Sequence, residues 1–353
     1  YQRFLDGNAL AKAWKERIRT EAAGMRERGV PLRLVSIRVG DNPAAALYTK
    51  NQRRACEEAG LEYELECLPG DSRQEALVDR LVRRNLDASV TGIMLQVPLP
   101  PGWKSGKFQA LISPDKDVEG VHPASMGLVL AGATDLVSCT ARAAYEIVRS
   151  TGVSIRGKEA VIVGHSEIVG KPLALLLLND LVTPTVCHIG TIDLAAHTRR
   201  ADLLFVAVGK PGLIRADMVK PGAVVVDIGI SRVPILDGSG RPVLDEKGAP
   251  KTRIVGDVDF EGVKEVAGFL TPVPGGVGPM TVAMLLENTI LAAKRARRIP
   301  SALGADPETL RHLFAAAGRP LDAPTAAIAS EIFTKFIVKV EGDRAANAYG
   351  LPR

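Results

Sequence analysis

Short apolar runs separated by amphipathic segments are the feature that most constrains the fold of this chain. A helix is expected over residues 8–29, followed by the apolar run "LRLVSIRVG" (32–40). A second helix over about 43–59 leads to a second apolar run, "EYELECL" (62–68). Strands that alternate with helices are joined by crossovers, so this pattern predicts a mostly parallel sheet.

The same alternation continues to residue 101. Residues 72–87 form an amphipathic pattern with Asp71 or Ser72 as the expected N-cap, because short polar side chains accept hydrogen bonds from the first amides of a helix. The run "VTGIMLQVPLPP" (90–101) is predicted to be a buried strand that ends in a proline-rich turn. Gln96 lies at the end of this strand, as a polar turn residue or as part of a site.

A second set of elements begins near residue 138 with a helix over 138–152. Four apolar runs follow: "KEAVIVG", "TPTVCHIG", "RADLLFVAVG" and "GAVVVDIG". This is a doubly wound α/β pattern, in which ligands bind at the carboxyl ends of the strands. The segment 236–250 contains an Asp-Gly hairpin signal and is expected to be a surface excursion. With 353 residues, the chain is long enough for two domains.

Composition excludes several classes of protein. No apolar run reaches the roughly 18–20 residues that span a bilayer, so no membrane partner is expected. The net charge of +5 comes without basic runs interleaved with aromatics, which favours an anionic small ligand over nucleic acid. The four cysteines have no paired spacing, which favours reduced thiols and a cytoplasmic location over a disulfide framework. No metal site is expected, because the histidines do not pair at metal-ligand spacing.

Two glycine-containing segments are candidates for ligand binding. In "VIVGHSEIVGKP", Gly164, Ser166 and Gly170 lie between a strand and a helix, where glycine lets a pyrophosphate approach the backbone. The motif is not a complete G-x-G-x-x-G, and an ordinary tight turn would look similar. Strands that end at Gly209 and Gly229 favour the dinucleotide interpretation, although no acidic residue follows the next strand to hold a ribose.

The loop "TPVPGGVGPMT" (271–281) is the second candidate, because a rigid segment with few side chains suits the approach of backbone to a planar ligand. Considered alone, it would also be a rigid loop that starts a helix.

Taken together, the motifs make the chain resemble one family. They occur in family order from "LDGNALA" (5–11) to "NTILAA" (288–293), over about four fifths of the chain, and include "LQVPLP", "DKDVEGVHP", "GKEAVIVGHSEIVGKPLA", "VVVDIGI", "GDVDF" and "TPVPGGVGPMT". The family is the bifunctional methylenetetrahydrofolate dehydrogenase/methenyltetrahydrofolate cyclohydrolases. The resemblance implies two α/β domains with a cleft between them, one folate-binding and one Rossmann-like and doubly wound, and usually a homodimer.

The resemblance also implies domain limits and ligands. A catalytic, folate-binding domain is expected over 1–137 plus 275–300, and an NAD(P)-binding domain over 138–274. Residues 301–353 lie beyond the resemblance and are expected to be a helical extension. The expected substrate is a tetrahydrofolate derivative, and the expected cofactor is NADP, with NAD not excluded.

Site residues follow from the positions that match the family motifs. Expected catalytic residues are Tyr48, Gln52, Gln96 and Glu119. Expected substrate-binding residues are Leu95, Val97, Pro274, Gly275 and Gly276. Expected cofactor-binding residues are Gly164, His165, Ser166, Ile189, Gly209 and Ile230.

This chain departs from the family pattern at four of these positions. Gln52 stands where the family has a lysine, four residues after the tyrosine and therefore on its helix face. Glu119 replaces an aspartate that holds the pterin, and His165 and Ile189 replace an arginine and a serine that serve the 2′-phosphate of NADP. An amide cannot titrate, so the substitution at Gln52 removes a proton carrier that hydrolysis needs.

Three hypotheses follow for the function. The first is a folate-dependent dehydrogenase with weak or absent cyclohydrolase activity. The second is the full bifunctional enzyme, in which water or Arg53 supplies protons. The third is a folate-binding protein without turnover, which the intact glycine turns and the loop 271–281 argue against.

Overall fold

The computed structural model describes residues 4–41, 43–133, 136–246 and 248–297. The expected extension over 301–353 and the last three residues of 275–300 lie outside this part of the chain.

The first domain is built on a three-stranded parallel sheet with the order β2-β1-β3. The helices run between the strands, as the alternating pattern predicts. The elements up to the second domain are α1 (Gly7–Glu27), β1 (Arg33–Val39), α2 (Pro43–Ala59), β2 (Glu62–Leu68), α3 (Gln74–Leu86), β3 (Gly92–Leu95), α4 (Ser105–Gln109), η1 (Pro114–Lys116) and α5 (Pro123–Leu130).

The expected N-cap of α3 is wrong. Arg73 holds the N-cap position, and its side chain makes no capping hydrogen bond. Asp71 and Ser72 instead belong to the turn after β2, in which the amide of Ser72 donates to Pro69 O at 3.1 Å. Because Asp71 and Ser72 form this turn, they do not cap the helix.

The second domain has a five-stranded parallel sheet with the order β10-β7-β6-β4-β5. Its direction of winding reverses between β4 and β6, which creates a switch point at their carboxyl ends. Its elements are α6 (Cys139–Ser150), β4 (Glu159–Val163), α7 (Gly170–Asn179), β5 (Thr183–Cys187), α8 (Leu194–Thr198), β6 (Leu203–Val206), η2 (Ala216–Met218), β7 (Val224–Asp227), α9 (Phe260–Val263) and β10 (Phe269–Leu270). The predicted fold class, two α/β domains with parallel sheets, is confirmed.

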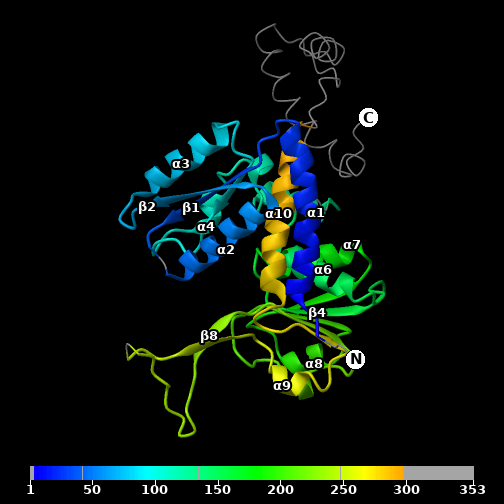
Figure 1. Cartoon of the computed structure of the whole chain (residues 1–353). Coiled ribbons are helices and arrows are strands. Elements are labelled where there is room, and N and C mark those ends of the chain that lie inside the picture. Colours follow the sequence, from blue (N-terminus) through cyan, green and yellow to red (C-terminus); the bar gives the residue numbers. More distant parts are fainter. Residues whose placement is uncertain (1–3, 42, 134–135, 247, 298–353) are drawn as a thin grey trace.

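A two-stranded antiparallel arm extends from the second domain (Figure 1). It consists of β8 (Ser231–Pro234) and β9 (Thr252–Val255), so the predicted surface excursion is present. Its first turn is wider than the two-residue Asp-Gly turn of the sequence signal. Asp237 accepts hydrogen bonds from the amides of Ser239 and Arg241, and Gly240 has the positive φ of 78°.

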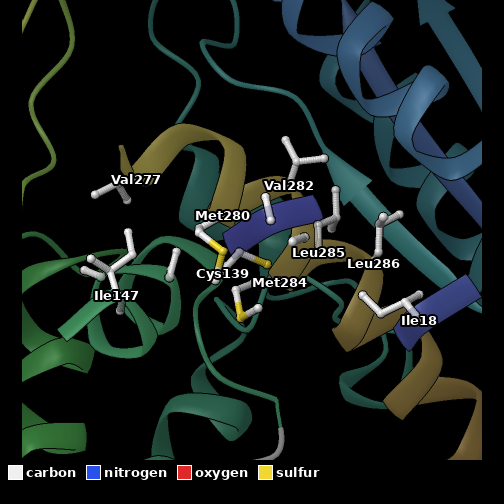
Figure 2. Packing of buried hydrophobic residues seen from close by; sticks show 14 of the residues in the cluster. Ile18, Cys139, Ile147, Val277, Met280, Val282, Met284, Leu285 and Leu286 are labelled. Atoms are coloured by element: carbon white, nitrogen blue, oxygen red, sulfur yellow. The ribbon is translucent and has the colours of Figure 1, made fainter. Parts of the chain in front are cut away.

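The long helix α10 (Val277–Arg297) joins the two halves of the molecule. In Figure 1 it lies beside α1, between the two sheets, and it packs against α1, α6 and α2. Figure 2 shows its apolar side chains together with Ile18 of α1 and Ile147 of α6. These residues belong to one buried cluster that reaches both sheets. None of the described helices is long and apolar enough to cross a membrane.

A buried amide fixes α10 to the connection between the domains. Asn288 is fully buried, and its Nδ2 donates to Val118 O at 2.9 Å and to Val137 O at 3.0 Å. Both carbonyls lie outside regular secondary structure, so the amide supplies the hydrogen bonds that a helix or sheet would otherwise provide. The side chain therefore specifies how α10 is placed against this segment.

Replacing Asn288 by alanine should lower the free energy of unfolding by about 2–4 kcal/mol, because Val137 O loses its donor, Val118 O keeps only the weak thiol donor of Cys139, and a small cavity forms. Urea denaturation measures the change. Asn179→Ala is the control, since Asn179 is exposed, and its effect should stay within about 0.5 kcal/mol. Equal effects of the two substitutions would contradict the anchoring role of Asn288.

Candidate active site

Gln52 is the centre of a buried hydrogen-bond network in the first domain. Its Oε1 accepts from Gln96 Nε2 at 2.9 Å and from Tyr63 Oη at 3.2 Å, and its Nε2 donates to Met94 Sδ at 3.1 Å. The Gln96 amide also donates to Ser36 Oγ at 2.8 Å. Gln52 is fully buried, and both ends of its amide are occupied.

Three members of this network were not predicted from the sequence. Ser36, Tyr63 and Met94 belong to β1, β2 and β3, respectively. They meet Gln52 only because α2 packs across the sheet, so no local pattern could have indicated them.

Tyr48 lies one helical turn before Gln52 and is hydrogen-bonded to its amide, the partner that helix geometry predicts. Burial of the hydroxyl raises the pKa of Tyr48 well above its ordinary value, and the nearby Cys139 and Glu119 act in the same direction. The residue as a whole is still 36% exposed. The site therefore offers a buried, neutral phenol hydroxyl on a side chain that is partly accessible.

Glu119 faces the same region from the segment after β3. Its Oε2 accepts from the amide of Leu95 at 3.3 Å. Burial raises the pKa of Glu119 to about 8, and the negative charge of Asp117 adds to the shift. Glu119 is thus a neutral carboxylic acid at pH 7, which can donate as well as accept a hydrogen bond.

The basic residues of α2 lie outside this network. Lys50 is exposed, and Arg54 is paired with Glu58 at 2.7 Å. The guanidinium of Arg53 lies over the outer face of the Tyr63 ring, 5.3 Å from its centre, where the two residues line a cavity of about 590 Å³. None of the four expected catalytic residues lines this cavity, so Arg53 is not placed to act on their face.

The predicted substrate loop packs on the start of α1. Gly275 has a φ of +104°, and a Cβ at Gly7 would lie 1.7 Å from Gly276 O, so glycine is required for this approach. The peptide bonds before Pro98 and Pro274 are cis. Leu95 is buried, whereas Val97 is 49% exposed next to the end of β3.

In the second domain, the turn after β4 is as tight as its glycines suggest. A Cβ at Gly164, whose φ is +121°, would lie 2.4 Å from Ala207 O. A Cβ at Gly170, the first residue of α7, would lie 2.0 Å from Gly164 O. Ser166 Oγ accepts from the amide of Val169 at 3.1 Å, so the serine in the second motif position stabilises the turn itself.

The remaining cofactor candidates lie in the turns after the strands near the switch point. His165 follows β4 and His188 follows β5, with ring centres 5.2 Å apart. Gly190 donates to His188 Nδ1 at 3.1 Å, and Ile189 is fully exposed. Gly209 follows β6 with a φ of +69°, and Ile230, which follows β7, is 64% exposed.

Within the described residues, no group of three or more His, Cys, Asp or Glu side chains is placed to hold a metal ion.

Comparison with known proteins identifies the fold and its two halves. A model of the tetrahydrofolate dehydrogenase/cyclohydrolase catalytic domain matches residues 5–119, and a model of the NAD(P)-binding domain of the same family matches residues 138–297. The chain belongs to the tetrahydrofolate dehydrogenase/cyclohydrolase family. The resemblance seen in the sequence motifs is thus confirmed, and the five-stranded sheet is the core of an NAD(P)-binding domain.

Relatives within the tetrahydrofolate dehydrogenase/cyclohydrolase family cover most of the chain. A protein from Mesorhizobium japonicum named bifunctional protein FolD 2 is 47% identical over 297 residues, which are 84% of this chain and 93% of that protein. The crystal structure of the bifunctional enzyme FolD from Campylobacter jejuni is 41% identical, with a TM-score of 0.75, and covers 83% of this chain and 99% of its own. The enzyme from Trypanosoma brucei, solved with NADP and an inhibitor, is 36% identical, has a TM-score of 0.75 and covers 83% and 97%.

The raised pKa of Glu119 predicts a pH-dependent stability. The carboxyl has an ordinary pKa of 4.5 and a folded pKa of about 8, so its neutral form stabilises the fold fully below about pH 4.5, and this contribution is lost as pH rises through about 8. The glutamine in Glu119→Gln cannot ionise. The free energy of unfolding of this variant, relative to that of the wild type, should therefore increase between pH 5 and pH 9.

Urea denaturation at pH 5, 7 and 9 measures this difference. The exposed Glu75→Gln is the control and should run parallel to the wild type. If Glu119→Gln also runs parallel, Glu119 is already ionised in the folded protein at pH 7.

Proposed function

We propose that this protein oxidises 5,10-methylenetetrahydrofolate to 5,10-methenyltetrahydrofolate by transfer of a hydride to NADP⁺. The convergence of Tyr48, Gln96 and Glu119 beside the end of β3 is the observation that carries this proposal. Hydride transfer needs the substrate carbon to be held against the nicotinamide, and it needs no proton carrier on the protein. Membership of the family supports both the folate substrate and the dinucleotide.

In the folate site, we assign the pterin contacts to the polar cluster and the flanking backbone. The neutral carboxyl of Glu119 can both donate to and accept from the pterin ring, and the partly exposed side chain of Tyr48 gives an aromatic surface against which the ring can pack. The substrate-binding backbone would come from Leu95, Val97 and the loop at 274–276. The ligand would then lie between the two domains.

On the cofactor side, the tight turn from Gly164 to Ser166 would hold the pyrophosphate at the start of α7. Gly209 and Ile230 would contact the nicotinamide half. His165 and Ile189 occupy the positions that face the adenosine 2′-phosphate in the family. Because a histidine can carry a positive charge, we favour NADP over NAD. NAD is the alternative, and the comparison of both nucleotides in a binding titration decides between them.

The cyclohydrolase reaction is proposed to be weak or absent. Hydrolysis of the methenyl group requires proton transfer, and the Gln52 amide neither titrates nor has a free end. One observation favours the full bifunctional alternative: Glu119 has a pKa of about 8 and lies next to Tyr48, so it could carry a proton near neutral pH.

A homodimer in the cytoplasm is the remaining part of the proposal. The arm formed by β8 and β9 leads to exposed apolar side chains at Ile235, Leu236 and Leu244, which suit a contact with a second copy. The four cysteines are all free, and three of them are buried, as expected in a reducing compartment. We also propose a catalytic, folate-binding domain over 1–137 plus 275–300 and an NAD(P)-binding domain over 138–274.

Gln52→Lys should restore or raise methenyl hydrolysis. An amine at this position shares the face of Tyr48, and Gln96 can turn its amide so that the oxygen faces the ammonium. A positioned acid or base typically contributes about 10²–10⁴-fold, and a partial gain of about tenfold or more is expected because the surroundings suit a neutral amide. Absorbance separates methenyl formation from its decay.

The control is Gln74→Lys, the same substitution at the exposed first residue of α3. It should leave hydrolysis at the wild-type rate. The wild type should accumulate methenyltetrahydrofolate when it is given the methylene substrate and NADP⁺. If the wild type instead hydrolyses the methenyl compound as fast as it forms it, the bifunctional alternative is correct. If it binds neither NADP nor NAD, the dehydrogenase proposal fails.

A further inference from the structure

Two buried aspartates lie behind the turns that follow β6 and β7. Asp227 ends β7 and is 3% exposed, and Asp257 follows β9 and is 0% exposed. Neither carboxylate takes part in a salt bridge with another described residue. Their hydrogen bonds come from backbone amides, so the two negative charges are held by the main chain and not by a cation.

Each carboxylate ties a predicted cofactor turn to the segment after β9. Asp257 Oδ2 accepts from the amides of Val208 at 2.7 Å and Gly209 at 2.9 Å, in the turn after β6. Asp227 Oδ1 accepts from the amide of Gly229 at 3.0 Å, in the turn after β7, and from the amide of Asp257 at 3.0 Å. The two turns therefore share one rigid support.

The packing of the two aspartates is reciprocal. A Cβ at Gly229 would lie 2.1 Å from Cγ of Asp257, and a Cβ at Gly256 would lie 1.9 Å from Oδ2 of Asp227. Each carboxylate thus packs on the glycine of the other segment, at a distance that no side chain permits. The motifs "VVVDIGI" and "GDVDF" supply both aspartates and their glycines.

The two oxygens of the Asp257 carboxylate are used differently. Asp257 Oδ1 is buried without a hydrogen-bond partner, and both amides from the turn after β6 converge on Oδ2 alone. An asparagine oxygen could accept both hydrogen bonds without the cost of burying a charge. The carboxylate of Asp257 therefore places a negative charge here that is hydrogen-bonded through one oxygen only and is offset by no described cation.

We propose that Asp257, braced by Asp227, is a positioning residue that fixes the turns at Gly209 and Ile230 and places a buried negative charge behind the nicotinamide. The inference rests on the proposed dehydrogenase function. The oxidised nicotinamide ring is cationic and the reduced ring is neutral, so this charge favours binding of NADP⁺ over NADPH. In a site of low dielectric constant, such an interaction is much stronger than in water.

The test measures the dissociation constants of NADP⁺ and NADPH for the full chain by calorimetric titration. Asp257→Asn should raise the dissociation constant of NADP⁺ by about tenfold or more, because the negative charge is lost. The factor by which the dissociation constant of NADPH rises should be at least about threefold smaller, because the asparagine oxygen still accepts hydrogen bonds from the turn. Gly229→Ala is the contrast, because its methyl group displaces the Asp257 side chain but keeps the charge, so both nucleotides should weaken equally. Asp259→Asn is the control and should change neither, because Asp259 only caps α9.

Equal weakening of both nucleotides by Asp257→Asn would overturn the proposal, as would unchanged NADP⁺ affinity. Binding of a folate analogue to the same preparation shows that the variant is folded. If Asp257→Asn does not fold, Asp227→Asn removes the neighbouring charge and carries the same comparison. Failure of the wild type to bind either nucleotide would instead refute the dehydrogenase function, which keeps the two failures distinct.

Discussion

The packing of α10 against both α1 and α6 is the constraint on which the rest of this structure depends. The buried side chains on this helix belong to a single cluster that reaches both sheets. Burial of this much apolar surface holds the two domains in one arrangement, and the hydrogen bonds from Asn288 fix the connection between them. The catalytic domain and the NAD(P)-binding domain are built on different sheets, so the packing of α10 sets their relative position.

Burial decides the protonation state of Glu119 in the first domain. Its carboxyl is kept neutral at pH 7, because an ionised group would lose its hydration with few hydrogen bonds to replace it. The Tyr48 hydroxyl is neutral at pH 7 even in water, and burial moves its pKa further from this pH. Gln52 fits this neutral environment, since its amide satisfies Gln96 and Tyr63 without introducing a charge. Position 52 is thus part of a consistent uncharged network, and a lysine there would need a lowered pKa.

The buried carboxyl of Asp227 in the second domain accepts more backbone hydrogen bonds than that of Glu119. Glu119 receives one backbone hydrogen bond, whereas Asp227 receives three, from Gly229, Asp257 and Val258. These hydrogen bonds offset burial, so the pKa of Asp227 rises only to about 6 and the group is largely ionised at pH 7. The number of amides that point at each carboxyl therefore helps to keep Glu119 neutral and Asp227 largely ionised at pH 7.

The sequence by itself determined the fold class and the family, and it predicted which elements carry the candidate site. Alternation of strands and helices predicts parallel sheets, and the spacing of Tyr48 and Gln52 predicts their shared face, because both depend on local backbone geometry. The wrong cap of α3 shows the limit, since a turn competes for the same polar residues. Only the tertiary structure decided that Tyr63 closes on Gln52, that Glu119 is neutral and that Asp227 and Asp257 pack on each other's glycines. These features arise because segments that are distant in sequence approach each other and exclude water from between them. A local sequence pattern contains no information about such an approach.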